Sequence, residues 1–391
     1  MTRLTCRLCG SSTVEPLLDF GEQPIVHHLK RTADEAVKGY PFRLGHCTTC
    51  DFLQLTNPIA PEILYENYLT FSQWKNQPHV DRLIQVLRSF TQLGPESRLL
   101  EIGCNDGSFL NSLREQGITN CIGVEPANDV YQLARAKGLR VLNSFFGPSM
   151  LYQLEGSYDV IITRQVLEHI VDLHGFLNAL STVMKPDAML VIEIPDSQWQ
   201  IETLDYGLWE EHVNLFTLNT LDQLLKRHNL SIIHHETTLF SGRALTVFVE
   251  KRQKPITGLL PRGGDGAIIQ RYKEGFPILR DALQALLSER RKPMVYGCGA
   301  RSTTVVNHLG LQGIAGFVDD QAEKQGFFAP GCNLPVVPWS EDLADAFFLF
   351  GVNTENEGKV IERRGLKPGQ YCSILPPSRY LPDAWKALIQ G

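Results

Sequence analysis

Residues 98–108 read Arg-Leu-Leu-Glu-Ile-Gly-Cys-Asn-Asp-Gly-Ser, and this stretch decides the fold of the chain. The apolar run 99–102 predicts a short buried strand, and the apolar pattern over 109–113 predicts a helix directly after the turn. Gly103 and Gly107 let the backbone of the turn pass close to a bound ligand, because glycine has no Cβ atom. A strand, a glycine turn and a helix in this order predict a ligand-binding α/β unit.

Further strands follow at the spacing of a doubly wound parallel sheet. Apolar runs at 121–125, 158–163 and 189–195 each predict a buried strand. Glu125 ends the second strand, where an acidic side chain accepts hydrogen bonds from the two hydroxyls of a ribose. The sequence therefore predicts a Rossmann-like domain with its ligand at the carboxyl ends of the strands.

The glycine turn resembles the E/D-x-G-x-G-x-G loop of class I methyltransferases more than the G-x-G-x-x-G turn of dinucleotide-binding domains. We therefore expect S-adenosylmethionine as the cofactor, with a nicotinamide-binding domain and a scaffold without ligand as alternatives. Asn105 and Asp106 could serve only as turn formers, and Phe145 could pack in the core rather than stack on adenine. The expected cofactor contacts are Glu101, Gly103, Asn105, Asp106, Gly107, Glu125, Pro126, Phe145 and Gln165.

Two Cys-x-x-Cys pairs predict a zinc site in the first fifty residues. Each pair places two thiolates on one side of a metal ion, and the second pair completes a tetrahedron. Four thiolates leave no coordination position for water, so we expect a structural Zn²⁺ ion. We also expect His27 and His28 on a loop that faces the active site. The predicted zinc ligands are Cys6, Cys9, Cys47 and Cys50.

The length of 391 residues and the changes in composition indicate three units. We predict a zinc-binding module at 1–65, a methyltransferase domain at 66–255 and a C-terminal Rossmann-like α/β domain at 256–391. Glycine and proline residues mark the connector between the last two, and an amphipathic helix is expected over 267–291. The net charge of −6 argues against a dedicated nucleic-acid binder. With neither a signal-peptide pattern nor a long apolar run, a cytoplasmic protein without membrane association is expected.

The same stretches resemble the deoxysugar C-methyltransferases, which act on nucleotide-linked 4-keto sugars. The resemblance covers nearly the whole chain and implies a zinc module, a class I methyltransferase domain and a C-terminal α/β domain. It rests on CRLCG (6–10), LLDFGEQPIVHHL (17–29), CTTC (47–50), LLEIGCNDGSFL (99–110), GVEPANDV (123–130), NSFFG (143–147) and YGCGARSTT (296–304).

This resemblance also implies roles for individual residues. His212, in the run GLWEEHVNLF (207–216), would be the general base, with Glu211 beside it. His169 matches a second active-site histidine of the family, and Arg301 matches a basic residue that could face a nucleotide diphosphate. Because adjacent residues of a strand point in opposite directions, we expect an irregular loop at 211–212.

Several positions depart from the family pattern. Trp209 and Phe71 stand where tyrosines are usual, and Arg164 and Gln165 replace a pair of asparagines. A charge such as that of Arg164 at the end of a buried strand needs a partner. That partner could be an anionic part of the substrate, Glu168 or Glu193. The expected substrate contacts are Phe71, Arg164, Trp209 and Arg301.

The sequence supports four hypotheses. The leading one is a monomeric methyltransferase that transfers a methyl group to carbon of a small-molecule acceptor, a nucleotide-linked 4-keto sugar. The second is O- or N-methylation of a different nucleotide-sugar or natural-product acceptor. The third is a non-catalytic nucleotide-sugar binding protein. The fourth is a nicotinamide oxidoreductase, in which Asp319 or Asp320 would bind the ribose.

Overall fold

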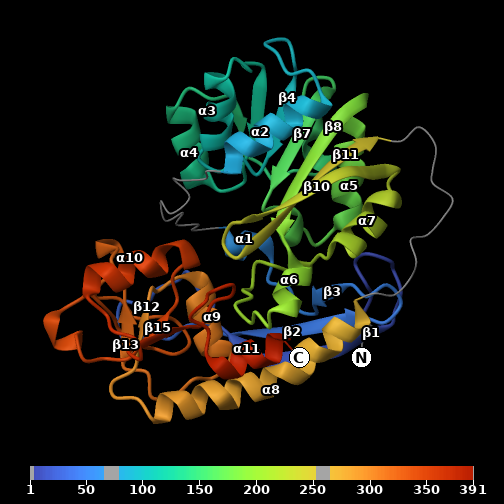
Figure 1. The fold of residues 1–391 in the computed structure, drawn as a ribbon. Coiled ribbons are helices and arrows are strands. Elements are labelled where there is room, and N and C mark those ends of the chain that lie inside the picture. The colour runs from blue at the N-terminus through green and yellow to red at the C-terminus, as the bar shows by residue number, and fades with distance from the viewer. Residues whose placement is uncertain (1–3, 66–78, 252–264, 391) are drawn as a thin grey trace.

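The computed structural model describes residues 4–65, 79–251 and 265–390. Figure 1 shows three units, with the central sheet above and the N-terminal and C-terminal units packed side by side below it. Phe71 and the predicted domain boundary at 255/256 lie outside the described residues, and the boundary at 65/66 borders on them. The predicted division into three domains stays a prediction.

The N-terminal unit is an antiparallel sheet with the strand order β1-β2-β3-β9. It consists of β1 (Val14–Gln23), β2 (Tyr40–Cys47) and β3 (Leu53–Leu55), and the short helix α1 (Pro61–Leu64) follows. Its fourth strand, β9 (Asn214–Leu215), comes from the middle of the chain and pairs with β3. The residues directly after Glu211 and His212 are therefore part of the N-terminal sheet.

The central unit is a seven-stranded sheet with the order β10-β11-β8-β7-β4-β5-β6. Its parallel strands are β4 (Leu99–Ile102), β5 (Cys121–Val124), β6 (Val141–Leu142), β7 (Tyr158–Arg164) and β8 (Met184–Pro195). The antiparallel hairpin β10 (Leu230–Leu239) and β11 (Arg243–Lys251) completes one edge. The predicted doubly wound sheet is confirmed. Its chain order reverses between β4 and β7, the place where ligands bind in such sheets.

Helices cover both faces of this sheet because its strands are apolar on both sides. On one face lie α2 (His79–Phe90), α3 (Ser108–Glu115) and α4 (Asn128–Ala136). On the other face lie α5 (Leu173–Val183) and α7 (Leu218–Lys226). The shorter connections contain η2 (Pro148–Gln153), η3 (Leu167–His169) and α6 (Ser197–Glu202).

The C-terminal unit is a parallel sheet with the order β14-β13-β12-β15-β16. Its strands are β12 (Met294–Tyr296), β13 (Gly316–Val318), β14 (Val336–Val337), β15 (Phe348–Phe350) and β16 (Tyr371–Ser373). Its helices are α8 (Gly266–Ser288), α9 (Ala300–His308), α10 (Thr354–Arg364) and α11 (Asp383–Gln390), with η4 (Ala322–Lys324) and η5 (Glu341–Leu343) between strands. The predicted second α/β unit and the helix near 267–291 are confirmed.

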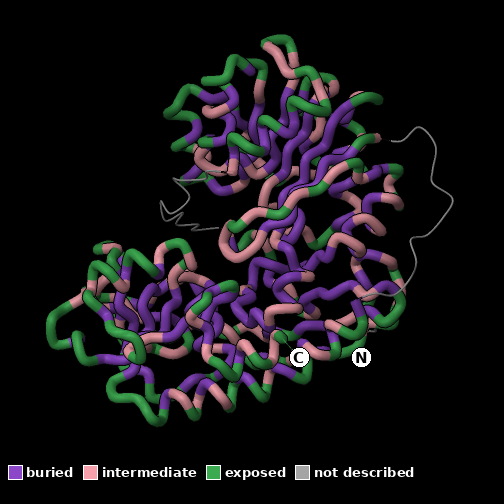
Figure 2. The backbone as a smooth tube through the Cα atoms, in the orientation of Figure 1, coloured by how far each residue is buried: buried purple, intermediate pink, exposed green. Residues whose placement is uncertain are grey.

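One hydrophobic core joins the N-terminal and C-terminal units. It contains Phe20 and Phe42 of the N-terminal sheet, Tyr206 and Leu208 of the central chain segment, and Tyr272 of α8. Figure 2 shows buried stretches of backbone both in the central sheet and in the region below it. Because burial of apolar area is the main favourable term in folding, this shared core ties the three units together. In the part of the chain that the structure describes, no helix is both long and apolar enough to cross a membrane.

Candidate active site

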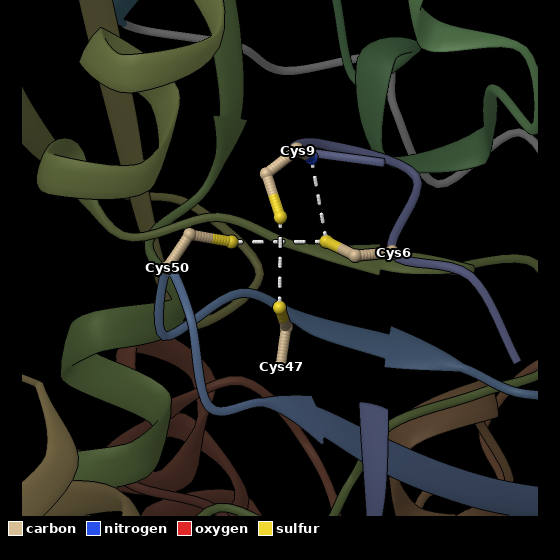
Figure 3. Close-up of side chains that lie close together, drawn as sticks. All are labelled: Cys6, Cys9, Cys47 and Cys50. Atoms are coloured by element: carbon tan, nitrogen blue, oxygen red, sulfur yellow. Dashed lines mark hydrogen bonds between the residues drawn. The ribbon is translucent and has the colours of Figure 1, made fainter. Parts of the chain in front are cut away.

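The four predicted zinc ligands converge in the N-terminal unit, as Figure 3 shows. The Sγ atoms of Cys6 and Cys50 lie 3.7 Å apart, as do those of Cys9 and Cys47. A tetrahedral zinc ion with Zn–S bonds of about 2.3 Å requires sulfur–sulfur distances of about 3.8 Å. Gly10 follows the first pair with φ of +76°, which allows the tight turn. The cluster therefore fits a structural Zn²⁺ ion with four thiolate ligands.

The turn after β4 has the backbone that the glycines predict. Gly103 has φ of +73°, and a Cβ atom there would lie 2.3 Å from Cγ2 of Val166. Asn105 also has a positive φ, and its backbone N–H donates to Oε2 of Glu125 over 2.9 Å. The N–H of Ala127 donates to Oε1 of Glu125 over 2.9 Å. Two backbone donors thus fix the carboxylate at the end of β5 and leave its remaining lone pairs for a ligand.

A cavity of about 580 Å³ opens at the carboxyl ends of the central strands. Its volume is in the range of small-molecule and cofactor sites. Gly107 and Arg301 are not among its lining residues. Of the predicted site residues, the cavity brings together Glu101, Gly103, Asn105, Asp106, Glu125, Pro126, Phe145, Arg164, Gln165, His169, Trp209, Glu211 and His212.

Two buried carboxyl groups lie on the cofactor side of this cavity. Burial raises the pKa of Glu101 to about 8, and its Oε2 has no hydrogen-bond partner among the described residues. Burial also raises the pKa of Glu125 to about 7, although its two backbone donors oppose this shift. A cationic ligand with a ribose, such as S-adenosylmethionine, fits this pair. Its ammonium group would meet Glu101 and its hydroxyls would meet Glu125.

Arg164 has a protein partner, one of those that the sequence left open. Its Nε lies 3.3 Å from Oε1 of Glu193, and its guanidinium lies 5.0 Å from the ring centre of Phe109. Nε2 of His79 lies 3.2 Å from the other oxygen of Glu193. Burial alone would raise the pKa of Glu193, but the charges of Arg164 and His79 lower it to about 2. Arg164 therefore balances a buried carboxylate at the cavity wall.

The predicted catalytic residues meet on another part of the cavity wall. The rings of His169 and His212 are 5.1 Å apart at an interplanar angle of 89°, and Trp209 lies 4.0 Å from the His212 ring. Glu211 Oε2 lies 3.8 Å from Nδ1 of His169. The expected irregular loop is confirmed, because the N–H of His212 bonds the carbonyl of Trp209 in a turn. This turn directs the adjacent side chains of Glu211 and His212 into one cavity.

Burial sets the charge of the two histidines. It holds the pKa of His212 well below its usual range, and the nearby His169 lowers it further. Burial also lowers the pKa of His169, which Glu211 partly offsets. His212 is therefore a neutral imidazole at neutral pH and can accept a proton.

Three further residues lie next to these side chains, and of them only Tyr65 lines the cavity. The hydroxyl of Tyr65 lies 3.0 Å from Nδ1 of His169. Nδ1 of His27 lies 3.2 Å from Oε1 of Glu211, so the loop contacts a lining residue, although neither His27 nor His28 lines the cavity itself. The N–H of Val26 donates to Oε1 of Glu210, whose pKa burial raises to about 7. Sequence reasoning missed Tyr65 and Glu210. Their only sequence signals are the position of Tyr65 after the zinc module and the neighbours of Glu210.

Arg301 lies apart from the cavity in a buried ion pair. Its Nη2 donates to Oδ2 of Asp205 over 2.6 Å and to the carbonyl of Pro376 over 3.3 Å. Its side chain is 7% exposed. The expectation that Arg301 faces a diphosphate finds no support in this geometry, because a protein carboxylate already holds the guanidinium.

Three family profiles match consecutive parts of the chain. They describe a zinc binding domain at 6–65, a methyltransferase domain at 74–235 and a C-methyltransferase C-terminal domain at 268–357. The C-methyltransferase NovU of Streptomyces niveus is 24% identical over 92% of this chain and 93% of its own length. A ubiquinone biosynthesis O-methyltransferase of Bartonella tribocorum is 25% identical over 26% of this chain and 43% of its own length.

Among solved structures, the chain is similar to an S-adenosylmethionine dependent methyltransferase from Mesorhizobium loti. The TM-score is 0.34 at 16% identity, over 42% of this chain and 95% of that one. The PH0226 protein of Pyrococcus horikoshii is also similar. Its TM-score is 0.38 at 15% identity, and the match covers 48% of this chain and 98% of that one.

The order of the three profiles matches the order of the three units in the structure, and the match to NovU spans all of them. The four cysteines of the cluster lie within the match to the zinc binding domain, and the glycine turn beside the cavity lies within the match to the methyltransferase domain. The chain is an S-adenosylmethionine-dependent methyltransferase, similar over nearly its whole length to the C-methyltransferase NovU.

Proposed function

We propose that this enzyme methylates a carbon atom next to the ketone of a nucleotide-linked 4-keto deoxysugar. The observation that carries the proposal is His212, a buried neutral imidazole that lines the same cavity as the cofactor turn. A carbon next to a ketone becomes a nucleophile only when a base removes its proton. The match to the C-methyltransferase NovU over nearly the whole chain supports carbon as the acceptor atom.

When bound, S-adenosylmethionine supplies an electrophilic methyl group at a sulfonium. Gly103 would let the backbone approach the cofactor, Glu125 would accept hydrogen bonds from its ribose hydroxyls, and Glu101 would pair with its ammonium group. Phe145, which is 45% exposed at the cavity wall, offers a face for adenine. These residues would hold the cofactor in the cavity that His212 also lines.

In that cavity, a ring nitrogen of His212 takes the proton from the carbon beside the ketone. The electrons of that C–H bond move into the carbonyl group and give an enolate. Tyr65 and His169 line the same cavity and offer hydrogen bonds to its oxygen. The enolate carbon then forms a bond to the methyl carbon as the carbon–sulfur bond breaks. The ketone is restored, the thioether leaves, and the proton stays on His212 until it passes to solvent.

The proton-removal step can be tested without methyl transfer. A nucleotide-linked 4-keto-6-deoxyhexose is incubated in D₂O with the zinc-loaded enzyme and S-adenosylhomocysteine, and exchange at the carbon beside the ketone is followed by proton NMR. We expect enzyme-dependent exchange that His212→Gln reduces by on the order of a hundredfold or more. Asp187→Asn, a change at an exposed position of β8, serves as control. Exchange that is unaffected by His212→Gln would contradict the proposal.

Methylation of oxygen or nitrogen is the second candidate, because Trp209 packs on His212 where the family usually has a tyrosine. A base such as His212 also activates a hydroxyl or amine. Methyl transfer to an acceptor without exchange of its C–H bonds would favour this candidate.

A further inference from the structure

The segment 203–212, here called the 203–212 loop, carries the predicted catalytic residues but is held by the neighbouring units. It leaves α6 of the central unit and enters β9, which pairs with the N-terminal sheet. Figure 1 shows α9 and α11 of the C-terminal unit beside α6 and the chain that follows it. The position of Glu211 and His212 therefore depends on contacts that the central sheet does not make.

Arg301 of α9 makes the shortest of these contacts. Its Nη2 donates to Oδ2 of Asp205 over 2.6 Å, and Asp205 is fully buried. The other carboxylate oxygen, Oδ1, accepts the backbone N–H of Gly207 over 2.9 Å. The Asp205 carboxylate thus links a guanidinium of the C-terminal unit to the backbone two residues before Trp209. A Cβ atom on Gly207 would lie only 3.4 Å from the Arg301 carbonyl, so the loop lies directly on α9.

Other C-terminal side chains hold the same stretch of backbone. The indole N–H of Trp385 donates to the carbonyl of Thr203 over 2.8 Å. The hydroxyl of Tyr272 donates to the carbonyl of Asp205 over 2.8 Å. Nδ1 of His308 lies 2.8 Å from the carbonyl of Tyr206. Helices α8, α9 and α11 each contribute one of these bonds, so the whole C-terminal unit supports the first half of the loop.

The N-terminal unit holds the second half. The N–H of Val26 donates to Glu210 over 2.9 Å, and His27 pairs with Glu211 over 3.2 Å. The loop is therefore fixed at both ends by units outside the central sheet. Burial alone would lower the pKa of His27, but its pairing with Glu211 raises it, which fits an ion pair at this end.

We propose that Arg301 is a positioning residue that acts through Asp205 on the catalytic turn, and that the C-terminal unit thereby completes the active site. The proposal rests on the proposed function, in which His212 is the base. Arg301 touches neither the cavity nor a reacting atom. Removing its charge leaves the buried carboxylate of Asp205 without a cation, and a buried ion that loses its partner forces the surrounding structure to rearrange. A shift of about 1 Å in a catalytic group can cost on the order of a hundredfold in rate.

The test compares Arg301→Gln and Arg301→Lys with Lys324→Gln, all in the full-length zinc-loaded chain. Lys324 is a matched control, because it is a buried cation of the same unit paired with Asp319 rather than with the loop. Hydrogen–deuterium exchange with mass spectrometry follows amides in peptides covering 203–216. Kinetics with the 4-keto sugar nucleotide give kcat and KM, and calorimetry gives the affinity for S-adenosylmethionine.

We expect Arg301→Gln to increase amide exchange across 203–216 and to lower kcat by on the order of ten- to a hundredfold. The affinity for S-adenosylmethionine should stay within about twofold of the unaltered enzyme. Arg301→Lys, which retains the charge, should restore part of kcat, and Lys324→Gln should leave exchange in 203–216 unchanged. If Arg301→Gln does not fold, Asp205→Asn removes the same ion pair and keeps the acceptor for Gly207.

Two results would overturn the proposal. One is unchanged amide exchange in 203–216 in Arg301→Gln. The other is a raised KM for the sugar nucleotide at unchanged kcat, which would make Arg301 a substrate contact. The amide-exchange measurement needs no methyl acceptor. It therefore still tests the positioning role of Arg301 if the unaltered enzyme fails to act on the sugar nucleotide. That failure would contradict only the proposed function.

Discussion

The two α/β units build the same hydrogen-bonded turn, yet they differ in what lies beside it. In the central unit, Glu125 accepts the N–H groups of Asn105 and Ala127. In the C-terminal unit, Asp319 follows β13 and accepts hydrogen bonds from the N–H groups of Cys298 and Gln321, over 2.8 and 2.9 Å. Both acids thus sit at the end of a second strand and hold the turn that follows the first.

The two turns differ in what lies beside the acidic residue, which in the C-terminal unit is a lysine. Nζ of Lys324 donates to the carbonyl of Cys298 over 2.8 Å and lies 3.4 Å from Oδ2 of Asp319. Glu125, in contrast, lines the cavity of about 580 Å³. Asp320 is also held, by Arg363 and Arg364. A glycine turn with an acidic residue therefore specifies a local fold, and a ligand site requires open space beside it. This contrast argues against the nicotinamide alternative.

The largest expected effect comes from replacing the acidic residue of each turn, Glu125 or Asp319. Glu125→Ala should weaken binding of S-adenosylmethionine by at least about a hundredfold, because each hydrogen bond to a charged group contributes about 1.5–3 kcal/mol and two are lost. Asp319→Ala should leave this affinity unchanged while lowering the melting temperature, since Lys324 loses its partner. Calorimetric titration measures the affinity. Equal effects of the two variants on it would contradict the contrast drawn between the turns.

A second test uses a buried histidine of the C-terminal unit. Burial lowers the pKa of His308 from 6.5 to about 4. The unfolded chain therefore takes up a proton at this group near pH 6.5, and the folded chain does so only near pH 4. The contribution of neutral His308 to stability is complete above pH 6.5 and is lost as the pH falls toward 4, by about 3 kcal/mol at most.

His308→Asn should flatten this part of the pH dependence, because asparagine does not titrate and can still donate to the carbonyl of Tyr206. Urea unfolding at intervals between pH 7 and pH 4 measures the free energy of unfolding. The other buried histidines remain in both proteins and cancel in the difference. An unchanged slope between the two proteins would show that His308 does not titrate in this way.

The cofactor side of the site could be predicted because its determinants are local in the sequence. Gly103 and Asn105 need positive φ values, and Glu125 ends the next strand, so a short window of sequence contains the whole turn. The zinc ligands are similar, because the spacing within each Cys-x-x-Cys pair fixes two ligands at a time. The structure places both groups as expected.

The catalytic wall could be predicted only in part, because its contacts join distant segments. Tyr65 meets His169 across 104 positions of the chain, and Val26 meets Glu210 across 184. Asp205 is the partner of Arg301 through tertiary packing alone, 96 positions away. No local pattern marks such pairs, so the sequence suggested a ligand for Arg301 where the fold supplies a carboxylate.

A third test compares glycines in the two turns. Gly103 has φ of +73° and no room for a methyl group, whereas Gly299 has φ of −107° and would meet only Oγ of Ser302 at 3.9 Å. Gly103→Ala should therefore destabilise the turn by about 1–3 kcal/mol and weaken cofactor binding, and Gly299→Ala should be tolerated. Thermal unfolding with and without S-adenosylhomocysteine measures both effects. A larger loss from Gly299→Ala would mean that the C-terminal turn, rather than the central one, is the constrained one.

The smallest expected effect is a shift in the pKa of His212, with His308 as the comparison. Burial lowers the pKa of both histidines, but His169 lowers that of His212 further. His169→Gln should therefore raise the pKa of His212 and move the acid limb of the solvent-exchange rate to higher pH, by less than about one unit. His308→Asn should leave this limb in place. Because His169→Gln also changes the rate itself, the position of the limb in the pH profile is measured rather than the rate at one pH. A limb that stays in place or moves to lower pH would show that His169 does not lower the pKa of His212. His212 and His308 would then differ only in their surroundings, since His212 lines the cavity and His308 does not.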